Sequence, residues 1–93
     1  MKDVSKEEFR RIFLKNLFRR LIDSYMIQDE NLKIIISKHI PVRDEAYETQ
    51  LKTVSEKLAE MFMQKFSNES DANDMMKDEY KIKQWILETV KKI

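Results

Sequence analysis

Cationic side chains recur along the first part of the chain at a spacing that could meet a run of phosphates. Arg11, Lys15 and Arg19 lie four residues apart, so in a helix they share one face, and Arg20 lies next to that row. A row of this kind can neutralise successive phosphates of a nucleic acid. Residues 1–26 hold seven basic and four acidic residues, although the net charge of the whole chain is only +1. These four residues are therefore the candidates for phosphate contact.

The same row also has a structural interpretation, as a solvated helix face. Glu7 is spaced to pair with Arg11, and Asp23 is spaced to pair with Arg19. These pairs would leave the row with little net positive potential. Nucleic-acid binders usually carry a stronger basic patch than a chain of this net charge can offer. We therefore rank the solvated face above nucleic-acid contact. We rank docking of this amphipathic segment on a membrane surface lower still, because the core needs its apolar residues.

Other residue types that carry chemistry are scarce. His39 is the single histidine, and such a residue beside an apolar face more often packs against the backbone than acts in catalysis or metal binding. Cysteine and glycine are absent, which excludes thiolate metal sites and glycine-rich phosphate loops. The acidic segment 71–76 has Met75 and Met76 where a calcium loop needs an oxygen ligand and a glycine. The sequence predicts no catalytic residue, no cofactor and no metal site.

The composition favours helices as the elements that hold these residues. Hairpins commonly recruit glycine, which this chain lacks, and Pro41 is its only proline. The chain is 42% hydrophobic and 38% charged, a mixture that is typical of a globular protein. We predict an all-α fold in which residues 1–93 form a single domain. Its expected architecture is a small antiparallel bundle of four helices, the second one short.

Capping residues and apolar periodicity set the expected bounds of these helices. Ser5, followed three residues later by Glu8, forms a capping box, and Asp29 is the next expected N-cap. Pro41 ends the second helix, and the third helix is expected to begin at Pro41 or Val42. A polar segment over 67–74 is the expected loop. The predicted helices cover about residues 6–26, 30–39, 41 or 42 to 66, and 75–93. Three consecutive isoleucines at 34–36 would also suit a strand, but no other segment could pair with it.

The first helix carries more apolar surface than a helix with one buried face requires. Two neighbouring rows, Phe9-Phe13-Leu17-Leu21-Tyr25 and Leu14-Phe18-Ile22, together cover an arc of about 220°. In a bundle, part of this arc would leave aromatic surface uncovered, and such surface marks protein contacts. Met63 and Phe66 fall off the apolar stripe of the third helix and add to the excess. The candidates for partner contact are Phe9, Phe18, Met63 and Phe66, and the residues expected to be deeply buried are Leu17, Leu21, Leu58 and Ile86.

These features predict a non-enzymatic protein that acts by protein–protein binding, as a regulator, inhibitor or adaptor, and that self-associates as a homodimer. The alternative is a nucleic-acid-binding regulator that uses the basic face of the first helix. The longest wholly apolar runs are three residues, far short of a membrane span. The first residues also lack the apolar core of a signal peptide. We therefore expect a cytoplasmic protein that does not enter the membrane.

Overall fold

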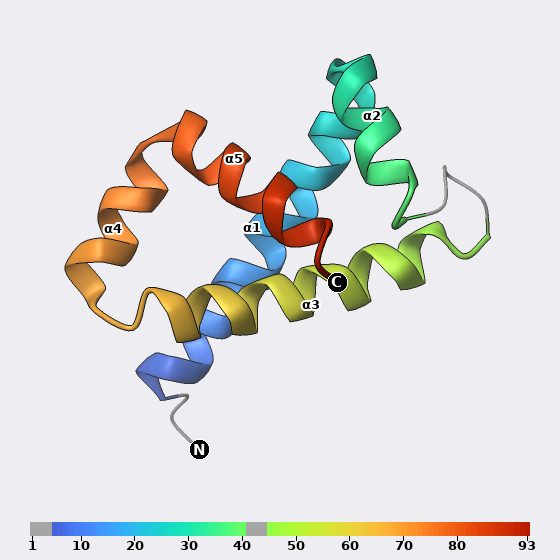
Figure 1. Ribbon diagram of the computed structural model, residues 1–93. Coiled ribbons are helices and arrows are strands. Elements are labelled where there is room, and N and C mark those ends of the chain that lie inside the picture. The colour runs from blue at the N-terminus through green and yellow to red at the C-terminus, as the bar shows by residue number, and fades with distance from the viewer. Residues whose placement is uncertain (1–4, 41–44) are drawn as a thin grey trace.

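Five α-helices form the computed structural model, which describes residues 5–40 and 45–93. Helices account for 84% of this described part, and no strand occurs in it, so the all-α prediction is confirmed. Residues 34–36 lie within the second helix and not in a strand. In chain order the helices are α1 (Lys6–Gln28), α2 (Glu30–Ser37), α3 (Tyr47–Lys65), α4 (Glu69–Lys77) and α5 (Glu79–Val90) (Figure 1).

The predicted count of four helices is one short, because most of the expected loop over 67–74 is helical. The Asn68 side chain accepts a hydrogen bond of 2.8 Å from the Ser70 amide and begins α4. Asp78 has an extended backbone between α4 and α5, and its carboxylate accepts from the amides of Tyr80 and Lys81 at 3.1 and 3.2 Å. Asn68, inside the expected loop, is therefore the N-cap of α4, and Asp78 divides the predicted fourth helix over 75–93 and is the N-cap of α5.

The two predicted N-caps nearer the N-terminus are confirmed. The Ser5 hydroxyl accepts from the Glu8 amide at 3.1 Å, and the Asp29 carboxylate accepts from the amides at the start of α2. Helix α1 ends two residues beyond the predicted Met26, and α2 ends at Ser37, two residues before the predicted His39. The predicted start of the third helix, at Pro41 or Val42, lies outside the described residues.

Four aromatic rings form the centre of the core and join three helices. Phe18 of α1 and Phe62 of α3 are fully buried, with ring centroids 5.6 Å apart. Trp85 of α5 lies 5.7 Å from Phe18 and 5.3 Å from Phe62, and Phe66 stacks 4.7 Å from Phe62. Edge-to-face and tilted contacts at these distances are favourable beyond the area that they bury. This cluster fixes how α1, α3 and α5 lie against one another.

The deeply buried residues of α1 belong to the second of its two apolar rows. Leu14, Phe18, Ile22 and Met26 are at most 5% exposed. Leu17 and Leu21 are only partly buried, so the prediction of deep burial is wrong for both. Leu58 and Ile86 are fully buried, as predicted. In α3 the buried stripe continues from Leu58 to Phe62, while Met61 is 37% exposed, because a straight helix drifts away from a strict seven-residue repeat.

Helices α1 and α3 run antiparallel, and the other helices are arranged around this pair. Helix α2 packs back on α1, and α5 packs against α2, α3 and α4. Figure 1 shows α4 at the end of the molecule where α3 terminates. Among the described elements, α5 is the helix whose backbone comes close to α4. No helix in the described residues is both long enough and apolar enough to cross a membrane.

Candidate protein-docking groove

The basic row of α1 faces a row of glutamates on α3. Arg11 donates from Nε to Glu60, and Arg19 Nη2 lies 2.5 Å from Glu48 Oε2. Lys15 Nζ lies 4.0 Å from Glu56 Oε1, at the outer limit of an ion pair. The three contacts run in opposite directions along the two helices, as an antiparallel pair requires. We call this set of contacts the ion-pair ladder.

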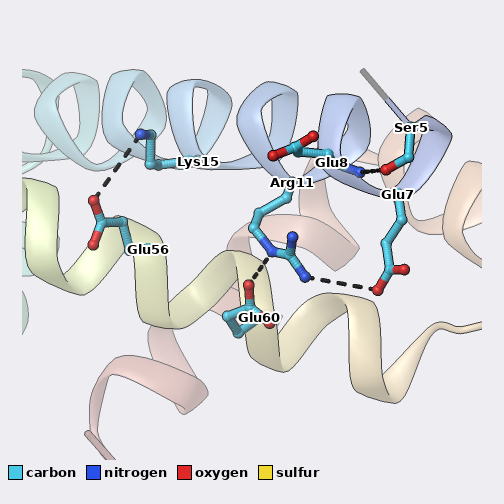
Figure 2. Close-up of polar contacts among 7 residues, drawn as sticks. All are labelled: Ser5, Glu7, Glu8, Arg11, Lys15, Glu56 and Glu60. Atoms are coloured by element: carbon cyan, nitrogen blue, oxygen red, sulfur yellow. Dashed lines mark hydrogen bonds and ion pairs between the residues drawn. The ribbon is translucent and has the colours of Figure 1, made fainter. Parts of the chain in front are cut away.

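The ladder changes how the candidate phosphate-contact residues should be interpreted. Figure 2 shows Arg11 between Glu7 of its own helix, at 3.6 Å, and Glu60 of α3. The predicted pairing of Arg11 with Glu7 is thus confirmed, and a second carboxylate joins it. Arg20 is exposed, and within the described residues it forms no ion pair. Three of the four candidate cations therefore have carboxylate partners that a phosphate would have to displace.

A groove of about 640 Å³ lies beside the ladder, where α1, α3 and α4 leave space between them. One wall is the first two turns of α1, with Phe9 and Phe13. The opposite wall is α4, with Ala72 and Met76, and Met63 near the end of α3 closes one side. The buried side chains of Leu14 and Phe62 form its floor. We call this space the α1–α4 groove.

The aromatic residues on the α1 wall are exposed despite their size. Phe9 is 67% exposed and Phe13 is 50% exposed, and Ile12 between them is 46% exposed. Aromatic side chains usually bury 150–250 Å² each, so the exposed parts of the two phenylalanines come to roughly 200 Å² of apolar surface, to which Ile12 adds. The largest apolar patch on a typical monomer is about 300–600 Å² and is often functional, so exposed side chains of this kind are candidates for contact.

Charged residues of both signs line the rim of the groove. The α1 wall carries Lys6 and Arg10, and the α4 wall carries Glu69 at the start of its helix. Glu7 also lines the α1 side, where Arg11 pairs with it. Arg10 Nη2 donates to the Phe66 carbonyl at 3.1 Å, which fixes the position of its guanidinium near the end of α3. The rim thus carries both signs on the α1 side and a carboxylate on the α4 side.

The structure places the four predicted partner-contact residues differently. Phe9 and Met63 line the groove. Phe18 is 0% exposed, so its assignment as a surface contact is corrected: it packs against Phe62 and Trp85 and is not available to a partner. Phe66 is partly buried against the same rings and does not line the groove.

The α4 wall was missed because its segment was predicted to be a loop. Ala72 and Met76 are four residues apart and face the groove together only because that segment is helical. The signal was present in the sequence. Asn68 and Asp78 are both N-cap residue types, and they bracket a stretch of nine residues that contains no glycine or proline.

The residue types considered for catalysis or metal binding lie apart from this groove. His39 is partly buried in the turn that follows α2. Among the described residues, no group of three or more histidine, cysteine, aspartate or glutamate side chains could hold a metal ion. The groove itself is lined mainly by apolar side chains, with charged residues at its rim.

Comparisons of this chain with protein-family models, with curated proteins and with solved structures give no match.

Proposed function

We propose that this chain is a small non-enzymatic protein-binding module, a regulator, inhibitor or adaptor, that holds its partner in the α1–α4 groove. The observation that carries the proposal is the exposure of Phe9 and Phe13 along an apolar groove of about 640 Å³. A groove between helices is a common site for an apolar helix face of another protein. A cytoplasmic setting, expected from the sequence, is part of this proposal.

The proposal favours binding over catalysis because of what lines the groove. Its centre is formed by aromatic, aliphatic and methionine side chains, and methionine adapts readily to the shape of a bound surface. Buried aromatic anchors supply most of the energy in typical protein interfaces. Two phenylalanines four residues apart on one helix can enter a partner's surface side by side.

Paired variants test this proposal. Phe9→Ser combined with Phe13→Ser removes both rings, whereas Ile27→Ser removes an equally exposed apolar side chain from the other end of α1. Tagged forms of the three proteins are compared by co-purification after nuclease treatment and mass identification of what is bound. We expect the proteins recovered with the unchanged chain and with Ile27→Ser to be lost from the double variant. Recovery of the same proteins with all three forms would contradict the proposal.

The nucleic-acid alternative has less support, because the ion-pair ladder occupies Arg11, Lys15 and Arg19. Replacing Glu48, Glu56 and Glu60 with glutamine would free Lys15 and Arg19 and leave Arg11 paired with Glu7 alone, without altering their positions in α1. If the ladder masks the row, the triple variant binds duplex DNA more tightly than the unchanged chain does, and its affinity depends more steeply on salt. Tight, salt-dependent binding by the unchanged chain, equal to that of the variant, would instead favour the alternative.

A further inference from the structure

We propose that the partner held by the α1–α4 groove is a second copy of this chain, docked about a two-fold axis so that the first turns of each α1 lie in the groove of the other. This inference rests on the proposed function and names its partner. It is carried by two properties of the groove, the shape of its α1 wall and the signs of the charges on its rim.

The α1 wall has the form of a groove ligand. Lys6, Phe9, Arg10 and Phe13 stand at positions i, i+3, i+4 and i+7, so one face of α1 presents two aromatic rings flanked by two cations. This is the spacing with which an amphipathic helix enters an apolar groove. This face of α1 lies beside the groove on the same surface of the molecule. A two-fold contact between identical chains requires such an arrangement, because each copy must offer both the inserted helix and the groove.

The charged residues on the rim can pair with the rim residues of a second chain related by a two-fold axis. Lys6, Glu7 and Arg10 line the α1 wall and Glu69 lines the α4 wall, so the two cations and two carboxylates of the rim sum to zero and α1 itself carries both signs. When α1 of one copy enters the groove of the other, its cations approach the partner's α4 wall, and the two-fold axis repeats this contact. A partner helix of a single charge sign would instead meet like charge on one wall, which disfavours it. The neutral, two-signed rim therefore fits a second copy better than a uniformly acidic or basic helix.

The mass of the full chain in solution is the first test. Sedimentation equilibrium at micromolar concentration should give about twice the monomer mass of 11.3 kDa. Phe9→Ser with Phe13→Ser should shift the chain to monomer, while Ile27→Ser, with a similarly exposed side chain on the same helix, should remain dimeric. Circular dichroism verifies that both variants keep their helices. A monomeric unchanged chain at high micromolar concentration would overturn the inference.

Charge reversal tests the two-fold arrangement without touching the apolar residues. In Lys6→Glu a glutamate would face Glu69 of the second copy, and in Glu69→Lys a lysine would face Lys6, so each variant alone carries two repulsive contacts per dimer. We expect each to dimerise several-fold to about tenfold more weakly at low salt, given the usual strength of exposed ion pairs. An equimolar mixture pairs opposite charges at both contacts and should recover the dimer.

The mixture also separates this inference from other forms of association. Dimers that neither variant weakens, or that the mixture does not restore, would overturn the two-fold docking. If the chain is monomeric yet loses co-purified proteins in the Phe9→Ser and Phe13→Ser variant, the inference fails while the proposed function stands. If the chain is monomeric and its co-purified proteins are the same in every variant, both fail.

Discussion

At the scale of single residues, the fold is stabilised mainly by the side chains that pack between α1, α3 and α5. Leu58 is fully buried in the middle of α3, one turn before Phe62 and its aromatic neighbours. A side chain in that position makes dense contacts that the surrounding helices cannot replace when it is removed. Partly exposed residues on the same helix have no comparable packing to lose.

This difference gives a stability prediction for α3. Leu58→Ala should lower the free energy of unfolding by about 2–5 kcal/mol, because it removes a packed side chain and leaves a cavity. Met61→Ala, where the side chain is 37% exposed, is the matched control and should cost well below that range. Urea unfolding followed by circular dichroism measures both. Equal losses for the two variants would mean that the buried face of α3 is assigned incorrectly.

Residue patterns alone could not have separated Phe18 from Phe9 and Phe13. All three belong to apolar rows of α1, and a periodicity of four treats the rows alike. Which row is buried depends on where α3 and α5 lie, and that is set by contacts between residues far apart in the sequence. The pairing of Glu60, Glu56 and Glu48 with the basic row is of the same kind, since it needs the antiparallel register of α1 and α3.

At the scale of elements, the single residue between α4 and α5 determines how α4 borders the groove. Asp78 interrupts what would otherwise be a continuous helix, and it caps α5 through the amides of Tyr80 and Lys81. The resulting change of direction lets α4 stand as a wall opposite α1, while α5 crosses to the core (Figure 1). Local capping chemistry thus positions a surface that involves residues from three helices.

The cap can be removed with a single substitution. Asp78→Ala should destabilise the protein by about 0.5–2 kcal/mol, the usual effect of losing an N-cap side chain. Asn73→Ala, an exposed position within α4, keeps every cap and should change the stability by less than about 0.5 kcal/mol. Thermal unfolding of the two variants gives the comparison. A loss in Asp78→Ala no larger than that in Asn73→Ala would argue against this capping role.

The elements that sequence reasoning found and missed share one physical cause. Ser5 and Asp29 were identified as N-caps because apolar periodicity resumes directly after them. Asn68 begins a helix in which most residues are exposed and Ala72 is the only buried residue. The sequence of this helix therefore has no apolar stripe that would predict it. A helix that packs with few residues leaves a weak pattern, and the fold class was predictable while the α4 wall was not.

At the scale of the whole molecule, two faces of α1 have different surroundings. One face, centred on Phe18, holds the helices together, and the other carries Phe9, Ile12 and Phe13 into solvent beside the groove. The wide apolar arc read from the sequence is therefore only partly used by the core. The proposed docking of a second copy would cover the remainder, and two-fold symmetry would close the assembly at two chains.

The most direct test of this account is a photo-crosslink from inside the groove. A photoreactive benzoylphenylalanine replaces Phe13 in the full chain, and the same group at Ile27 serves as the control on the other end of α1. After irradiation of the purified protein at micromolar concentration, mass spectrometry locates any adduct. We predict a crosslinked dimer from position 13, with the attachment in α4 of the second chain, and little or none from position 27. Absence of a crosslinked dimer at position 13, or equal yields from both positions, would contradict the account.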